Sequence, residues 1–303
     1  MSTTKNIFVA GAAGRLGQLV ITQLLHAGHQ VTALIRGADT KHAATAEDLR
    51  ARGVLVVEGD VHTPSSYEAA LRGLDSVVST LQGGPDVIID GQRQLLDAAV
   101  RAGVPHFIPS DFAIDYFGIP DGTHALLDLR RAFANYLHTQ PITYTHVLNG
   151  AFMEMLSDAN YGFIDFEDHS LAYWGDGHQK LDFTTMEDTA KAVELAVRDE
   201  QYRNKSLEIA GDQINYHGFQ SLLEELTGHP FSVKGLGSLT ELETSIERKK
   251  ATADSPYDYV MDQYNWAMNT GQAKLKHPLK ASALGFTPTS VRTVLAELLH
   301  PPV

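Results

Sequence analysis

The chain has 303 residues, 37 acidic against 24 basic side chains, a net charge of −13 and no cysteine. A chain of this length can bury a core without cross-links, and the lack of cysteine excludes disulfides, thiolate nucleophiles and cysteine-ligated metal sites. The acidic balance argues against nucleic acid or membrane partners, and neither a signal peptide nor an apolar run of ~18 residues is present, so we expect a soluble, cytoplasmic protein.

Short apolar segments alternate with helical segments in the first half of the chain. Strands are expected over 6–10, 30–35, 54–58, 76–81, 106–109 and 143–148, and helices over 16–27, 45–52, 64–72, 87–102 and 125–138. The strands are rich in Val and Ile on both faces, which is typical of a parallel sheet covered by helices on both sides. Strict alternation predicts a Rossmann-like, doubly wound α/β fold.

The pattern changes after Gly150. A helix over 186–198 and a strand over 206–209 indicate a return to the sheet, and residues from 213 onward are expected to be mostly helices and loops. We therefore expect a Rossmann domain over 1–150, completed by 181–210. Residues 151–180 and 211–303 should form a small, mainly helical substrate-binding region.

A glycine-rich turn joins the first strand to the first helix. It consists of Gly11, Ala12, Ala13, Gly14, Arg15, Leu16 and Gly17. Gly11 permits the tight turn, Gly14 lets the backbone approach a pyrophosphate, and Gly17 allows close packing of helix and strand. Its position between a strand and a helix predicts a dinucleotide-binding site, with a turn that merely packs as the alternative.

The second strand ends at Arg36, where an NAD-binding protein would place an acidic residue on the ribose 2′-hydroxyl. A guanidinium instead suits the 2′-phosphate of NADP, and Arg15 and Lys41 add positive charge nearby. Asp60, after the third strand, is placed to bind the adenine edge or to cap the next loop. NADP is therefore the expected cofactor.

Five segments together resemble the atypical short-chain dehydrogenase/reductases of the NmrA-like and isoflavone-reductase-like family. They are GAAGRLG at 11–17, the strand ending in Arg36, DAAVRAGVPHFIPSDF at 97–112, ITYTHVLNGAF at 142–152 and WGDGHQKLDFTTMEDTAKA at 174–192. The resemblance implies an extended Rossmann fold with NADP at the strand ends. Family members include reductases of aromatic compounds, quinone reductases and regulators that bind the cofactor without turning it over.

The resemblance also implies roles for individual residues. Those expected to line the cofactor are Ser79, Thr80, Leu81, Gln82, Ser110, Asn149 and Phe152, with Asp111 on the nicotinamide side. The alternatives are that Ser110 caps a loop and that Asn149 satisfies a turn.

The lysine that reductive family members usually carry is absent. The pattern K-x-x-x-R-[RK] matches at Arg130 and Arg131, but Leu126 occupies the lysine position, and no Tyr-x-x-x-Lys pair exists. Carbonyl reduction needs a proton donor or cation beside the oxygen, which a leucine cannot supply. Alternatively, Leu126 is a core residue.

Three other residues are candidates for proton transfer: Tyr116, His124 and Asp111. The pair His26 and His29 lacks a third ligand, so no metal is expected. An aromatic and methionine cluster after the sixth strand is either substrate pocket or core, and its members are Phe152, Met153, Met155, Tyr161 and Phe163.

Two functions remain open. The first is an NADPH-dependent oxidoreductase that reduces a small apolar or aromatic carbonyl, enone or quinone. The second is a non-catalytic regulator that senses NADP, which the missing lysine favours. The partners expected are a small-molecule substrate and a second copy or another protein, and the residues do not decide whether the chain is an enzyme.

Overall fold

The computed structural model describes residues 4–37, 40–156, 158 and 163–300. Contacts group the chain into two compact units. The first unit comprises Met1–Asp111, Leu129–Val147 and Thr189–Leu207, and the second comprises Phe112–Asp128, Leu148–Asp188 and Glu208–Val303. The domain bounds expected from the sequence stay a prediction.

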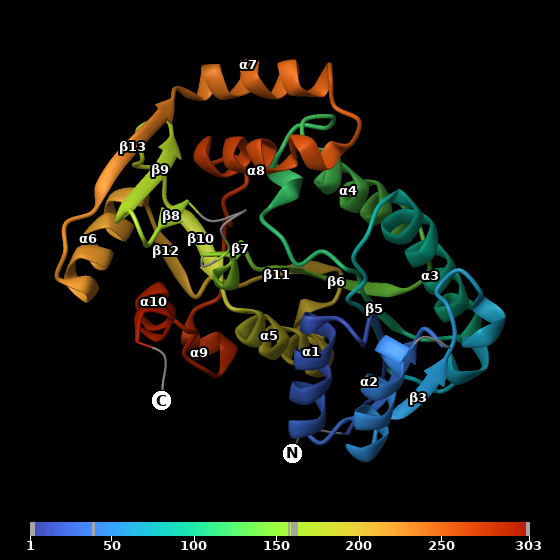
Figure 1. Cartoon of the computed structure of the whole chain (residues 1–303). Helices are drawn as coiled ribbons and strands as arrows, with labels where there is room; N and C mark the ends of the chain where they lie inside the picture. The colour runs from blue at the N-terminus through green and yellow to red at the C-terminus, as the bar shows by residue number, and fades with distance from the viewer. Residues whose placement is uncertain (1–3, 38–39, 157, 159–162, 301–303) are drawn as a thin grey trace. The chain divides into compact units, whose positions relative to one another are not determined.

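A seven-stranded sheet forms the first unit, in the order β11-β6-β5-β4-β1-β2-β3 (Figure 1). The strands are β1 (Asn6–Ala10), β2 (Gln30–Ile35), β3 (Leu55–Glu58), β4 (Ser76–Ser79), β5 (His106–Ile108), β6 (Thr143–Leu148) and β11 (Lys205–Glu208). All neighbours from β3 to β6 pair in parallel. Because the chain leaves β1 first toward β2 and later toward β4, the order reverses at β1, as in doubly wound folds. The predicted α/β Rossmann-like fold and the return of β11 to the sheet are confirmed.

Helices cover both faces of this sheet. They are α1 (Arg15–His26), α2 (Thr40–Ala51), α3 (Gln92–Ala102), α4 (Ala125–Leu137) and α5 (Met186–Arg198). Leucines and alanines of α3 pack with Phe133 of α4 against Phe8 and Phe107 of the sheet. Figure 1 shows α1 and α5 on the other side, and Nε2 of His29, just after α1, lies 3.5 Å from a carboxylate oxygen of Glu194 in α5.

Two predicted helices differ from the structure. Residues 64–72 form two short 3₁₀ turns, η1 (Pro64–Ser66) and η2 (Glu68–Leu71). The intervening Tyr67 has a non-helical φ of −136°, and its buried hydroxyl donates to the carbonyl of Val61, so tertiary burial interrupts the helix. The predicted helix over 87–102 starts with a π-helical turn, η3 (Asp86–Gly91), and continues as α3.

The second unit holds two small sheets as well as helices. The strands β7 (Ala151–Phe152), β10 (Leu181–Thr184) and β12 (Asp212–Ile214) form one sheet, and β8 (Ile164–Asp165), β9 (Ser170–Trp174) and β13 (Ser232–Gly237) form the other. The helices are α6 (Tyr216–Thr227), α7 (Leu239–Lys250), α8 (Val260–Asn269), α9 (Ala281–Leu284) and α10 (Val291–Leu299). The expectation of mostly helices and loops after 213 was therefore incomplete, because it omitted β12 and β13.

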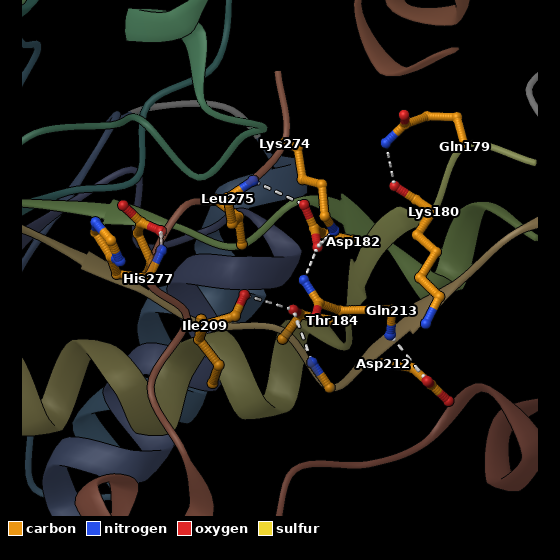
Figure 2. Close-up of polar contacts among 12 residues, drawn as sticks. Gln179, Lys180, Asp182, Thr184, Ile209, Asp212, Gln213, Lys274, Leu275 and His277 are labelled. Atoms are coloured by element: carbon orange, nitrogen blue, oxygen red, sulfur yellow. Dashed lines mark hydrogen bonds and ion pairs between the residues drawn. The ribbon is translucent and has the colours of Figure 1, made fainter. Parts of the chain in front are cut away.

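Asp182 of β10 connects three segments of this unit (Figure 2). One carboxylate oxygen accepts the backbone N–H of Leu275 at 2.8 Å, and the other is 3.0 Å from Nζ of Lys274 and also accepts the side-chain amide of Gln213. The backbone of Asp182 passes so close to Gly150 that a side chain there would overlap its carbonyl group. Gly150 also has a φ of +68°, a conformation that disfavours residues with a side chain. The close approach and the backbone conformation therefore each require glycine.

Candidate functional site

The glycine turn after β1 is packed tightly at its two ends. Gly11 has a φ of +79°, and a Cβ on it would lie 2.6 Å from the carbonyl oxygen of Thr80. A Cβ on Gly17 would overlap the carbonyl oxygen of Gly11 and reach within 2.9 Å of Oγ1 of Thr80. Both glycines are therefore needed for the protein's own packing.

Gly14 has different surroundings. It is exposed, with an ordinary φ of −74°, and a Cβ there would meet a single described atom within 4 Å, the carbonyl oxygen of Gly11 at 3.2 Å. Gly14 is the N-cap of α1 and has no side chain that could accept hydrogen bonds from the first N–H groups of the helix. These N–H groups can therefore bind an anion. The neighbouring Arg15 is exposed, while Ala13 and Leu16 are half-buried.

Arg36 borders a hollow of about 500 Å³ in the first unit. The hollow is lined by Arg36, Gly37, Glu58, Gly59, Asp60, Thr63 and Ser66. The expected residues Arg36 and Asp60 are thus brought together. Glu58 was not foreseen, and it places a second carboxylate beside Asp60, although Nη2 of Arg50 binds its Oε1 at 2.8 Å.

The predicted residues after β4 and β5 lie close to the glycine turn and to each other. The backbone N–H and Oγ1 of Thr80 each donate to the carbonyl of Ala10 at 2.9 Å. Oγ of Ser110 donates to the carbonyl of Leu81 at 2.6 Å, so these two segments are joined. Gln82 is exposed, and Ser79 is fully buried.

Asp111 is buried at the end of β5 and bound on two sides. Its Oδ2 lies 2.7 Å from Nδ1 of His146 on β6, and its carbonyl accepts Nε of Arg130 at 2.9 Å. Sequence reasoning missed His146. The available signal was its place on the sixth strand, one strand over from Asp111.

The other two proton-transfer candidates are buried in the second unit. Tyr116 is fully buried, and its ring centroid is 4.3 Å from that of Phe117. His124 is buried at the start of α4, where Nδ1 accepts the N–H of Leu127 at 3.3 Å and the ring stands edge-on to Tyr264. The ring thus accepts an N–H of the first turn of α4, as an N-cap side chain does.

Leu126 and Leu127 differ in burial. Leu127 is fully buried among the apolar side chains of the second unit, whereas Leu126 is only half-buried. The helix therefore gives the core position to Leu127. The position at which the resemblance predicts a lysine is therefore partly accessible.

The residues from Asn149 onward that are proposed to line nicotinamide or substrate belong to the second unit. Asn149 is fully buried, its N–H donates to Ala113 at 3.0 Å, and its Oδ1 accepts no hydrogen bond from the residues that the structure describes. Phe152 is half-buried and Met153 fully buried, while Phe163 packs edge-on against Tyr216 and Phe219. Tyr161 lies outside the described residues.

A second hollow, of about 770 Å³, was not foreseen. It lies in the second unit and is lined by Trp174, Gly175, Asp176, Gly177, His178, Gln179, Gly237, Ser238, Leu239 and Asn269. Within the described ranges, no three metal-ligating side chains cluster, and no helix is long and apolar enough to cross a bilayer.

A seven-stranded doubly wound sheet with a glycine turn after β1 defines a nucleotide-binding class of fold. The model of the NmrA-like family matches residues 3–265, and the chain belongs to this family.

Relatives carry the names of reductases. The isoflavone reductase homolog IRL of Zea mays is 29% identical over 76% of this chain and 77% of its own, and the isoflavone reductase homolog P3 of Arabidopsis thaliana is 30% identical over 69% and 70%. The structure of a binary complex of leucoanthocyanidin reductase with NADPH from Vitis vinifera matches with a TM-score of 0.81 and 20% identity, covering 96% of this chain and 98% of that one.

Proposed function

We propose that the chain is an NADPH-dependent oxidoreductase that reduces a small apolar or aromatic carbonyl, enone or quinone. The observation that carries the proposal is the pairing, in one unit, of an open glycine turn with a hollow bordered by Arg36. Reductase names among the relatives support it, as does the leucoanthocyanidin reductase structure with NADPH.

The residues present fit this cofactor. Gly14 leaves room for a pyrophosphate against the backbone and the first N–H groups of α1. Arg36 would hold the 2′-phosphate, and Asp60 would face the adenine. NADPH, when bound, supplies a hydride.

The second unit would bind the substrate. Asn149 has a buried side-chain oxygen without a hydrogen bond from any described residue, and Phe152 is partly accessible next to it. We assign both to the nicotinamide side, with Phe152, Met153, Phe163 and Tyr161 as substrate residues.

A quinone is the substrate class that best suits the missing lysine. Its product anion is delocalised, so it needs less stabilisation than the alkoxide formed from a ketone. The side chain of Leu126 is half-buried and has no group that can donate a proton or carry a positive charge. It therefore favours a quinone over a ketone as the hydride acceptor.

The same leucine supports a second candidate function, a regulator that binds NADP without turnover and passes its occupancy to a protein partner. We place either protein in the cytoplasm, with a second copy of the chain as a further partner.

NADPH oxidation across a panel of quinones, enones and aryl ketones separates the two functions. Turnover of at least one quinone supports the reductase. Tight NADPH binding without turnover of any compound favours the regulator, and no binding of either NADPH or NADH contradicts both.

A further inference from the structure

Three titratable side chains form a continuous hydrogen-bonded line in the first unit. Nδ1 of His146 is 2.7 Å from Oδ2 of Asp111, and Nε2 of His146 is 2.9 Å from Nε2 of His138. Asp111 and His146 are only 1% and 2% exposed, whereas His138, just after α4, is exposed. The line therefore joins solvent to the C-terminal end of β5.

These contacts assign the protons for the neutral form of the two rings. A carboxylate only accepts, so Nδ1 of His146 donates to Asp111. When His146 is neutral, its Nε2 is left as an acceptor. Nε2 of His138 then donates to His146, and Nδ1 of His138 is available to water. Partial burial and the neighbouring His146 lower the pKa of His138, which keeps this ring mostly neutral at neutral pH, although Asp111 opposes the shift.

Tyr144 and Arg130 also face the line. The ring of Tyr144 on β6 lies 4.5 Å from that of His138 and 5.0 Å from that of His146, between centroids. Nε of Arg130 on α4 binds the carbonyl of Asp111. The aromatic ring shields the contact between the two imidazoles, and the guanidinium holds the backbone that carries the carboxylate.

We propose that His138, His146 and Asp111 are a proton relay from solvent to the end of β5. The proposal rests on the proposed function, because reduction of a quinone by NADPH consumes one solvent proton. The hydride carries two electrons and one hydrogen to the quinone, and the hydroquinone anion then takes a proton.

Each transfer in the relay conserves charge and protons. Nδ1 of His138 takes a proton from water, while its Nε2 proton passes to Nε2 of His146. The Nδ1 proton of His146 passes to Oδ2 of Asp111, whose carboxyl group releases it toward the product anion.

Nitrogen NMR of histidine-labelled protein tests the line without any substrate. We expect His146 to carry its proton on Nδ1 and His138 on Nε2. His138→Gln should shift the signals of His146, whereas His26→Gln, at an exposed position at the end of α1, should leave them unchanged. A proton on Nε2 of His146 would overturn the relay.

Stopped-flow measurement with NADPH, 1,4-naphthoquinone and a pH indicator tests the transfer. In the unmodified protein, proton uptake should keep pace with NADPH oxidation. His138→Gln should slow uptake by roughly a hundredfold, the low end of general acid–base effects, and added imidazole should restore it.

Controls separate the relay from a structural role. His106→Gln removes another buried imidazole, one bound to Ser76 and Thr145, and should leave the pace of uptake unchanged. Unaltered uptake in both His138→Gln and His146→Gln would refute the relay. Absence of any NADPH oxidation would refute the proposed function and the role of the relay in reduction, while NMR would still judge the hydrogen-bonded line.

Discussion

Nη2 of Arg50 lies 2.8 Å from Oε1 of Glu58, at the border of the hollow that contains Arg36. The pair joins α2 to the end of β3. Both side chains are about half exposed, so the pair adds little to stability. Its effect is electrostatic. The positive charge of Arg50 offsets the negative charge of Glu58, one of the two carboxylates that line the hollow where a 2′-phosphate would bind.

Arg50→Ala should therefore weaken NADPH binding by roughly fivefold, which corresponds to about 1 kcal/mol, the repulsion between two like unit charges ~4 Å apart in water. Glu58→Gln should strengthen it by a similar factor. Calorimetric titration measures both. Arg101→Ala breaks a comparably exposed pair with Glu68 away from the hollow and should change nothing. Equal affinities in all variants would contradict the assignment of this hollow as the site of the 2′-phosphate.

Arg36→Ala should reduce affinity for NADPH about ten- to hundredfold and leave NADH affinity nearly unchanged, because a charge-assisted pair contributes about 1.5–3 kcal/mol. The same titrations with both cofactors decide it. Unchanged NADPH affinity would remove Arg36 from the phosphate site.

Gly14 and Gly17 should respond differently to substitution. Gly14→Val should keep the fold and abolish cofactor binding, since the side chain occupies space that the protein itself leaves free. Gly17→Val should lower the melting temperature, because its Cβ overlaps the carbonyl of Gly11, and overpacking costs about 1–3 kcal/mol. Circular dichroism and cofactor titration together check both. A folded Gly14→Val protein with normal binding would exclude the phosphate cradle.

Leu126→Lys should retain the fold, because this half-buried position leaves room for an ammonium group outside the core. It should also gain carbonyl reductase activity, because the resemblance assigns this position to the lysine that stabilises the reacting oxygen. Leu127→Lys is the matched control. It buries the charge at a fully enclosed position, so it should lose several kcal/mol of stability. Thermal melts compare the two, and a large loss of stability in Leu126→Lys would place that residue in the core.

Tyr216 should make the protein sensitive to alkali. Burial raises the pKa of its phenol to about 12, although a hydrogen bond from Asn269 opposes the rise. Its folded pKa exceeds the unfolded value of about 10, so its contribution is intact below pH 10 and is lost as pH rises through the folded pKa, by about 3 kcal/mol. Urea unfolding of Tyr216→Phe should show less loss over this window than the unmodified protein, and the exposed Tyr257→Phe should match the unmodified protein.

The first unit was largely predictable because its signals are local. The run from β1 through the glycine turn to Arg36 combines strand periodicity with glycines whose conformations depend on near neighbours. Tyr67 shows where this fails, since its burial under the sheet breaks a helix that its sequence neighbours favour.

The second unit was harder to predict because its short strands depend on distant partners. β7 has two residues and exists through pairing of Ala151 with Phe183, far along the chain.

The line from Asp111 to His138 in the first unit was missed because it also depends on residues that are distant in the sequence. It crosses from one strand to the next and then to a helix end, so no spacing in the sequence reveals it.

The crossing of Gly150 and Asp182 limits how this chain can change. Any side chain at 150 must displace the strand whose carboxylate holds Gln213, Lys274 and Leu275, so one substitution would disturb both β12 and the segment at 274–275. In a library randomised at both positions, selection for folded protein should return glycine alone at 150. Engineering of the second unit is therefore better directed to the walls of its 770 Å³ hollow, away from this crossing.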